Sequence, residues 1–320
     1  MIIVTRVAAL ALAFAAHTAL GQAWPTKPIR LISPYVAGGS NDVTARIVAE
    51  RLAVRLGQPV LVENKPGANN RIATELVARS PADGYTLLWA AAPHTVNPAL
   101  YGKLTYDTVK DFVPIVHGVM VPILLSVPAA SPAKSVKEYL ALARSDPQTA
   151  TVCSPGNGSG PHLAIEQLAA TSGVPLVHIP YKGDAPAVND LLGARVGAGM
   201  NAFATPLPHV KAGKLRALAV VATRRMPQLP DTPTFAEAGY AAVDAYAWFG
   251  LLAPAGTPKD VIERLNTEVN AILKLPETIE RFDVLGALPL GGTAMEFDKF
   301  IRADLEKWNR IVKERNIKAD

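Results

Sequence analysis

The chain has 320 residues, of which 49% are hydrophobic and 18% are charged, with a formal net charge of +5 and one cysteine. This length indicates about two domains, and the apolar fraction excludes wholesale disorder. Cys153 alone cannot form an internal disulfide or a cysteine-rich zinc site. The Lys and Arg residues form no run of five or more, so nucleic acid is not an expected partner.

Residues 1–23 have the features of an export signal. An uncharged apolar run, residues 7–16, follows Arg6, and the small residues Gly21 and Ala23 stand where a signal peptidase cuts. The run is well short of the roughly 20 residues that span a bilayer. The sequence therefore favours cleavage after Ala23 over retention as a membrane anchor, and we expect a protein exported to the periplasm.

Strand-like and helix-like segments alternate in the first part of the exported chain. The expected order is strand 28–33, helix 43–56, strand 60–62, helix 72–78 and strand 85–89. In the first helix, Val43, Ile47, Leu52 and Leu56 are spaced to share one face. This alternation predicts an α/β fold with a largely parallel sheet between helices.

The same alternation begins again in the middle of the chain, which indicates a second α/β unit. Its expected strands are 122–127, 150–153, 177–179, 196–200 and 217–221, and its expected helices are 135–144, 161–170 and 184–192. Ser135 with Glu138 forms a capping box, Pro161 suits a first helical turn, and Asp184 is an expected cap. Two further helices are expected after Thr257 and after the capping box of Thr293 and Glu296.

Two Gly-rich loops, one in each unit, are the strongest candidates for a ligand site. Each precedes a helix, whose N-terminus offers unpaired N–H groups and a positive dipole end, so a carboxylate or phosphate fits there. The candidate residues are Gly38, Gly39, Ser40, Asn41 and Asp42 in the first loop and Ser154, Gly156, Asn157, Gly158, Ser159 and His162 in the second. Neither loop matches a nucleotide motif. Either alone could be a tight turn without ligand, but their pairing favours ligand binding.

Other candidates follow expected strands, at the end where open α/β sheets bind ligands. His94 and Thr95 follow the strand at 85–89, and Asn201 follows the strand at 196–200. Lys182 also follows a strand and could pair with an anion, although a solvated surface lysine is the favoured interpretation. Trp89 and Trp248 both suggest core residues, and Trp89 is the better candidate of the two for stacking on a ligand.

Only one pair of residues suggests catalysis. Ser159 and His162 lie three residues apart at a helix start, as a nucleophile and base would. No third orienting residue or oxyanion motif accompanies them. We therefore expect a protein that is not an enzyme, with an exported hydrolase or isomerase as the alternative.

A series of motifs runs in order through the exported chain. They occupy residues 24–30, 37–42, 56–60, 62–68, 83–88, 154–159 with His162, 178–183, 213–219 and 251–258. In this order they resemble the Bug-type extracytoplasmic solute-binding proteins, which are the substrate-binding components of the tripartite tricarboxylate transporter family. The motifs are specific to that family and not to one ligand.

The resemblance implies a type II periplasmic-binding-protein fold. Two α/β lobes, each a mainly parallel sheet flanked by helices, would be joined by two crossing strands near residues 124–127 and 248–253. The first lobe would comprise residues 24–124 and 248–320, and the second residues 125–247. The lobes would close like a flytrap around the ligand.

The resemblance also implies the ligand and partners. A small organic carboxylate would lie between loops 35–42, 90–95 and 154–162 and the region of Asn201, which adds Tyr35, Ala37 and Ala92 to the candidate residues. No cofactor or metal is expected. The protein would be a monomer that presents its ligand to a membrane permease. A sensory or scaffold protein that signals to a partner such as a sensor kinase is the alternative.

The chain departs from the family pattern at two places. Asn69 and Asn70 stand where family members commonly have two glycines, and Asn201 stands where many have an aspartate. A missing charge at residue 201 would remove a partner for a ligand cation. Our hypothesis from the sequence is therefore a plain organic acid in preference to an amino acid.

Overall fold

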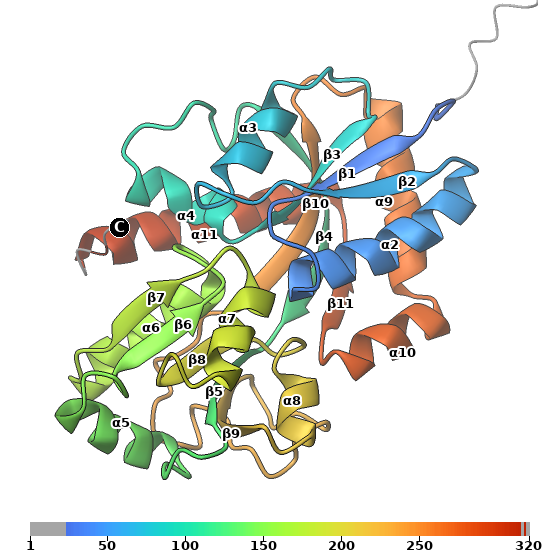
Figure 1. Ribbon diagram of the computed structural model, residues 1–320. Helices are drawn as coiled ribbons and strands as arrows, with labels where there is room; N and C mark the ends of the chain where they lie inside the picture. The colour runs from blue at the N-terminus through green and yellow to red at the C-terminus, as the bar shows by residue number, and fades with distance from the viewer. Residues whose placement is uncertain (1–23, 315–316, 318–320) are drawn as a thin grey trace, which may run out of the picture.

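The computed structural model describes residues 24–314 and residue 317, so the expected export signal, residues 1–23, lies outside the described residues. The chain forms two β-sheets, each flanked by helices, and Figure 1 shows them as two lobes side by side. We call sheet A with its helices lobe 1 and sheet B with its helices lobe 2.

Sheet A has the strand order β11-β4-β10-β3-β1-β2. Its strands are β1 (Ile29–Ser33), β2 (Val60–Asn64), β3 (Thr86–Ala91), β4 (Phe112–Val121), β10 (Ala247–Pro254) and β11 (Leu288–Gly291). The helices of lobe 1 are α2 (Ser40–Leu56), α3 (Arg71–Ala78), α4 (Pro93–Leu100), α9 (Lys259–Leu273), α10 (Pro276–Val284) and α11 (Ala294–Glu314). Strands β1 to β4 share one direction, and β10 and β11 run against them.

Sheet B has the strand order β7-β6-β8-β5-β9. Its strands are β5 (Ile123–Pro128), β6 (Thr151–Ser154), β7 (Val177–Pro180), β8 (Ala198–Ala202) and β9 (Leu215–Val221). The helices of lobe 2 are α5 (Val136–Ser145), α6 (Gly160–Ser172), α7 (Asp184–Leu192) and α8 (Leu207–Lys211). Among these strands β5 alone runs against the others. The predicted fold class, two mainly parallel sheets flanked by helices, is confirmed.

The chain passes from sheet A to sheet B at Pro122, between β4 and β5. The sequence placed this crossing near residues 124–127, but those residues pair with β8 and β9 inside sheet B. The chain returns through residues 222–246 and enters sheet A again as β10. No strand was expected at residues 112–121. In the structure Pro114 pairs with Leu252 of β10, beside a register shift in which Ile115 of β4 is the extra residue.

The helix starts follow local capping signals. The Ser159 hydroxyl accepts a hydrogen bond from the His162 N–H at 3.2 Å, so α6 begins where the sequence predicts. Thr293 and Glu296 form the reciprocal capping box of α11. Asp184 is not the cap of α7; Gly183 holds that place, and Asp184 is the first residue of the helix.

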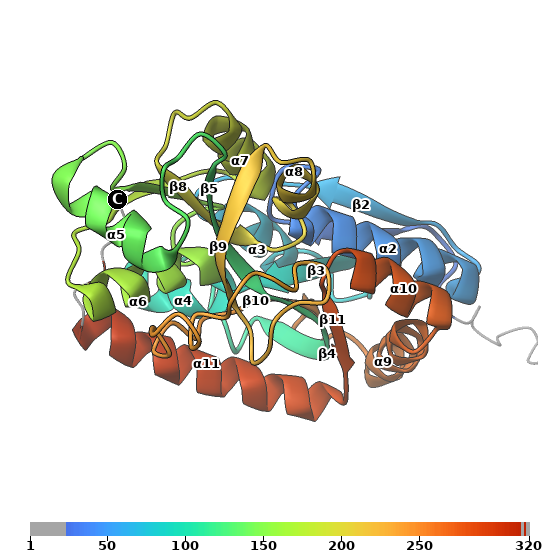
Figure 2. The same cartoon turned by 90° about the horizontal axis from the view of Figure 1, so that it is seen from below.

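Helix α11 runs along one edge of the molecule from β11 toward α6, as Figure 2 shows. Its buried residues, Phe297, Ile301, Trp308 and Val312, recur at helical spacing as the sequence predicts. Among the residues that the structure describes, no helix is both long and apolar enough to cross a membrane.

Candidate ligand-binding site

Loops from the two sheets meet where the lobes face each other. The Val36 N–H, after β1, donates to the Lys182 carbonyl, after β7, at 3.2 Å. The Ser40 hydroxyl at the start of α2 lies 3.1 Å from the Thr205 hydroxyl after β8. The first Gly-rich loop of lobe 1 is therefore in direct contact with lobe 2, and the lobes are closed on each other.

Two adjoining cavities lie at this boundary. The larger has a volume of about 290 Å³ and is lined by Pro34, Tyr35, Gly67, Ala68, Asn69, Asn70, Arg71, Tyr101, Pro155, Gly156, Asn157, Pro180, Tyr181 and Lys182. The smaller has a volume of about 20 Å³ and is lined by Tyr35, Ala91, Ala92, Pro155, Ser159, Gly160, Pro161, Asp184, Ala202, Ala247, Trp248 and Phe249. Because Tyr35 and Pro155 line both, one small molecule could extend from one cavity into the other.

The larger cavity has a basic lining. The Arg71 guanidinium lies 4.0 Å from the centre of the Tyr101 ring, and its Nε donates to the Ala68 carbonyl. Within residues 24–314, neither Arg71 nor Lys182 forms an ion pair. Both positive charges are therefore free to pair with an anion in the cavity.

Polar side chains without charge complete this lining. Asn69 and Asn70 have positive φ angles of 53° and 68°, a conformation that Asn tolerates better than most residues. The Asn69 side chain donates to Asn97 Oδ1 at 2.6 Å, and Asn97 Nδ2 donates back to the Asn69 carbonyl. Asn157 Oδ1 is buried without a hydrogen-bond partner among the described residues. These contacts fix the loop before α3 against α4, which positions the neighbouring Arg71.

The smaller cavity contains a buried carboxylate. Asp184 is 5% exposed, and its Oδ1 accepts hydrogen bonds from the Ala202 N–H at 3.0 Å and from Asn201 Nδ2 at 3.4 Å. Burial raises the pKa of Asp184 to about 6, although these hydrogen bonds act in the opposite direction. No Lys, Arg or His of the described chain forms an ion pair with it. Asp184 therefore places a carboxylate beside Asn201, and our hypothesis of a plain organic acid stays a prediction.

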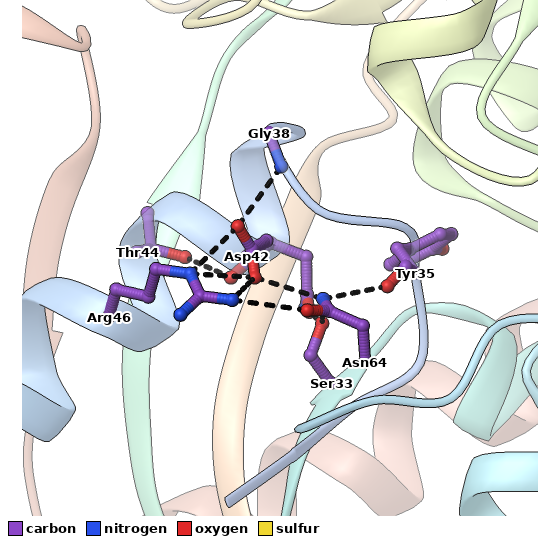
Figure 3. Close-up of polar contacts among 8 residues, drawn as sticks. Ser33, Tyr35, Gly38, Asp42, Thr44, Arg46 and Asn64 are labelled. Carbon is purple, nitrogen blue, oxygen red and sulfur yellow. Dashed lines mark hydrogen bonds and ion pairs between the residues drawn. The ribbon is translucent and has the colours of Figure 1, made fainter. Parts of the chain in front are cut away.

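The carboxylate of Asp42 holds its own loop together, as Figure 3 shows. It accepts hydrogen bonds from the Gly38 N–H at 3.0 Å, from Arg46 Nε at 3.0 Å and from Asn64 Nδ2 at 2.9 Å. Burial acts to raise the pKa of Asp42, but these donors outweigh it and the pKa is lowered. The neighbouring Asn41 accepts from Ser33 Oγ at 2.8 Å. Both side chains thus fix the start of α2 and do not line either cavity.

The loop after β3 reaches the boundary through Ala92 alone. His94 is buried with its Nε2 3.1 Å from the Thr108 carbonyl, and burial lowers its pKa to about 4. The Thr95 hydroxyl donates to Asp304 at 2.6 Å, which ties α4 to α11. The two polar residues therefore support the loop, and Ala92 lines the smaller cavity.

The second Gly-rich loop lines both cavities, but Ser159 and His162 do not pair with each other through the hydroxyl and the ring. Gly156 and Asn157 line the larger cavity and Ser159 the smaller. The Ser159 hydroxyl donates to the Gly156 carbonyl at 2.6 Å, whereas the ring of His162 accepts from the Gly158 N–H at 3.0 Å. Because the hydroxyl and the ring have separate partners, the arrangement of a nucleophile and its base is not present.

Comparison with known proteins assigns the chain to a family. The profile of the family described as tripartite tricarboxylate transporter family receptor matches residues 44–317. The chain belongs to this family. The predicted resemblance to the Bug-type proteins is thereby confirmed.

Solved structures of similar receptors cover nearly the whole chain. The periplasmic binding protein BugD is 34% identical with a TM-score of 0.88, over 93% of this chain and 100% of BugD. An R. palustris protein solved with adipate is 34% identical with a TM-score of 0.89, over 93% of this chain and 100% of that one. MatC from Rhodopseudomonas palustris with bound malate is 29% identical with a TM-score of 0.85, over 90% of this chain and 100% of MatC.

In this tripartite tricarboxylate transporter receptor, the predicted site residues divide into two groups. Tyr35, Ala92, Gly156, Asn157 and Ser159 line the cavities. The others lie around them: the structure places Ala37 and Gly38 on the surface, and it buries Gly39, Ser40, Asn41, Asp42, His94, Thr95, Ser154, Gly158, His162 and Asn201 in the supporting loops.

Sequence reasoning missed several residues that line the cavities of this receptor. Arg71, Tyr101 and Asp184 were not among the candidates. Lys182 is exposed, as the favoured interpretation had it, and it also lines the larger cavity. Trp248 lines the smaller cavity. Trp89 is fully buried, and its ring packs so closely on Gly118 that a Cβ at Gly118 would lie 2.3 Å from it. The preference for Trp89 as a ligand platform is therefore wrong. The sequence signal that could have indicated Lys182 and Asp184 was the end of the strand near residue 180, because both residues follow it.

Proposed function

We propose that this protein binds a small organic carboxylate between its two lobes and presents it to a membrane transporter. The observation that carries the proposal is the cavity of about 290 Å³ with unpaired Arg71 from lobe 1 and Lys182 from lobe 2 in its lining. A carboxylate there receives charge-assisted hydrogen bonds from both lobes at once. The relatives solved with adipate and with malate support this class of ligand.

Ligand capture in this proposal couples binding to closure. The lobes, residues 24–121 with 247–314 and residues 123–221, move about the two crossing segments, Pro122 and residues 222–246. The ligand enters the open cleft and pairs first with one lobe. The basic group of the other lobe then reaches the same anion only when the cleft closes, so the ligand stabilises the closed form. A transporter that recognises the closed form then receives loaded protein.

The proposed setting is the periplasm. Export would follow from cleavage after Ala23, and the mature protein would act as a monomer without performing chemistry on its ligand. The separate hydrogen bonds of Ser159 and His162 support a binding role over a hydrolase or isomerase. The mass of the mature chain from a periplasmic extract tests the cleavage site, and its sedimentation tests the monomer.

Calorimetric titration with organic acids tests the ligand class. Arg71→Gln and Lys182→Gln should each weaken binding of the acid that binds best by about tenfold or more, because each removes a charge-assisted hydrogen bond. Lys211→Gln, at an exposed position at the end of α8, is the matched control and should bind as the unmodified protein does. Equal affinity in all three variants would contradict the proposed site.

A thermal-shift screen identifies the acid. A true ligand at a hundredfold excess over its dissociation constant stabilises the folded protein by about 2.7 kcal/mol. If no carboxylate in a broad panel raises the melting temperature, the proposed function is wrong.

A further inference from the structure

The smaller cavity has room for one small polar group. Its volume of about 20 Å³ is just above the roughly 10–15 Å³ that a single water molecule needs. An ammonium group is similar in size to water. A carboxylate, with two oxygens on a carbon, is larger. The dimensions therefore select a compact substituent of the ligand.

The lining of this cavity is mostly apolar, and its one carboxylate among the described residues is that of Asp184. The Ser159 hydroxyl already donates to the Gly156 carbonyl. Asp184 accepts hydrogen bonds from the Ala202 N–H, the Asn201 side chain and the Ser40 N–H, and no cationic side chain of the described residues pairs with it. A buried carboxylate without a counter-charge attracts a cation.

The two cavities thus have opposite polarity. Arg71 and Lys182 make the larger one positive, and Asp184 makes the smaller one negative. A ligand carboxylate in the smaller cavity would lie against a second carboxylate. The favourable orientation places the ligand carboxylate in the larger cavity and a positive group in the smaller.

We infer that Asp184 makes this receptor selective for carboxylic acids that carry a protonated amine, with the ammonium group in the smaller cavity. The inference rests on the proposed function, since it presumes that the cleft binds a carboxylate. It reverses the preference for a plain acid that Asn201 alone suggested. Asp184 is the specificity-determining residue, and Asn201 orients it through the hydrogen bond between their side chains.

Calorimetry on matched acids tests the inference. The pairs are succinate and aspartate, glutarate and glutamate, and adipate and 2-aminoadipate, which differ only in the amino group. We expect the amino member of at least one pair to bind at least tenfold more tightly than its partner at pH 7.5. If every plain acid binds as tightly as its amino counterpart, or more tightly, the inference is wrong while the proposed function stands. If no acid of either kind binds, both are wrong.

A variant assigns the effect to Asp184. Asp184→Asn keeps the size of the side chain and an oxygen that accepts from Ala202, but it removes the charge. The ratio of affinities within the preferred pair should fall to about one, with the plain acid bound no more weakly than before. Asp231→Asn, at an exposed position in residues 222–246, is the matched control. An unchanged ratio in Asp184→Asn would overturn the assignment, and the comparison in the unmodified protein stands even if this variant folds poorly.

Discussion

Two buried aspartates at helix starts show how neighbouring groups decide the role of one residue type. Asp42 in the first turn of α2 has Arg46 and two N–H donors, and its pKa is lowered. Asp184 in the first turn of α7 has no cation, and its pKa is raised to about 6. The first carboxylate is already saturated and stabilises its loop. The second accepts hydrogen bonds but has no cation beside it, which is the premise of the proposed ammonium site.

Removal of the Asp42 carboxylate should therefore destabilise the fold. Asp42→Ala leaves the Gly38 N–H and Asn64 Nδ2 without their acceptor, which costs about 1–3 kcal/mol in the free energy of unfolding. Because the pKa of Asp42 is lowered in the folded protein, this stabilisation is complete above the pKa of the unfolded chain. It is lost as the pH falls through the lower folded pKa. Urea unfolding at pH 7 and at about pH 3 measures both effects.

Asp298→Ala is the control for this substitution. Asp298 also pairs with an arginine four residues later, but both side chains are partly exposed, so its loss should cost about 0.5 kcal/mol or less. If the two variants lose equal stability at pH 7, the carboxylate of Asp42 does not organise the loop.

At the scale of elements, the sequence predicts those helix starts whose capping residues lie close together in the chain. The caps of α6 and α11 each involve residues three apart, so both partners stand in one short window. Strand β4 has no such local signal, because it forms by pairing with β10, far away in the chain, with Ile115 as an extra residue beside Pro114. Residue types at helix starts are predictable in the same way, but their partners are not. Asp184 meets Asn201 only through the packing of α7 against β8.

The candidate site was predictable to a similar extent. Both Gly-rich loops lie at the lobe boundary, but the first contacts the segments after β7 and β8, whereas the second lines the two cavities. Arg71 and Lys182 line the same cavity because of how the lobes pack on each other, and no local sequence pattern encodes that packing. His94 and Thr95 have the chemistry of ligand residues, yet the structure uses both to hold α4 in place.

The start of α6 offers a test of packing between elements. A Cβ at Gly160 would lie 2.2 Å from the Tyr246 carbonyl oxygen and 2.6 Å from its carbon. Gly160→Ala should therefore lower the free energy of unfolding by about 1–3 kcal/mol through overpacking. Gly193→Ala at the end of α7, where the nearest atoms are 3.6 Å away, should change it by less than about 0.5 kcal/mol. Denaturant titration compares the two, and equal stability would show that α6 does not press on the segment before β10.

At the scale of the whole molecule, apolar and polar contacts join the lobes. Gly158 lies against Val96 and Leu100 of α4, and Gly286 lies against Phe203. The hydrogen bond from Val36 to Lys182 and the contact of Ser40 with Thr205 join the lobes across the cleft. Each such contact stabilises by only about 0.5–1.5 kcal/mol. A ligand that pairs with both lobes adds to these contacts and so favours the closed form, which is what a capture mechanism requires.

A disulfide across this contact should lock the closed form. The hydroxyl oxygens of Ser40 and Thr205 are 3.1 Å apart, so cysteines at both positions place their sulfur atoms close enough to bond after a small adjustment. The native Cys153 is fully buried and burial raises the pKa of its thiol to about 12, so it does not compete in oxidation. We expect the oxidised double variant Ser40→Cys/Thr205→Cys to exclude added ligand and the reduced form to bind it again, as measured by calorimetry. The single variant Ser40→Cys should bind equally under both conditions. Unhindered binding to the oxidised double variant would show that ligand reaches its site without separation of the lobes.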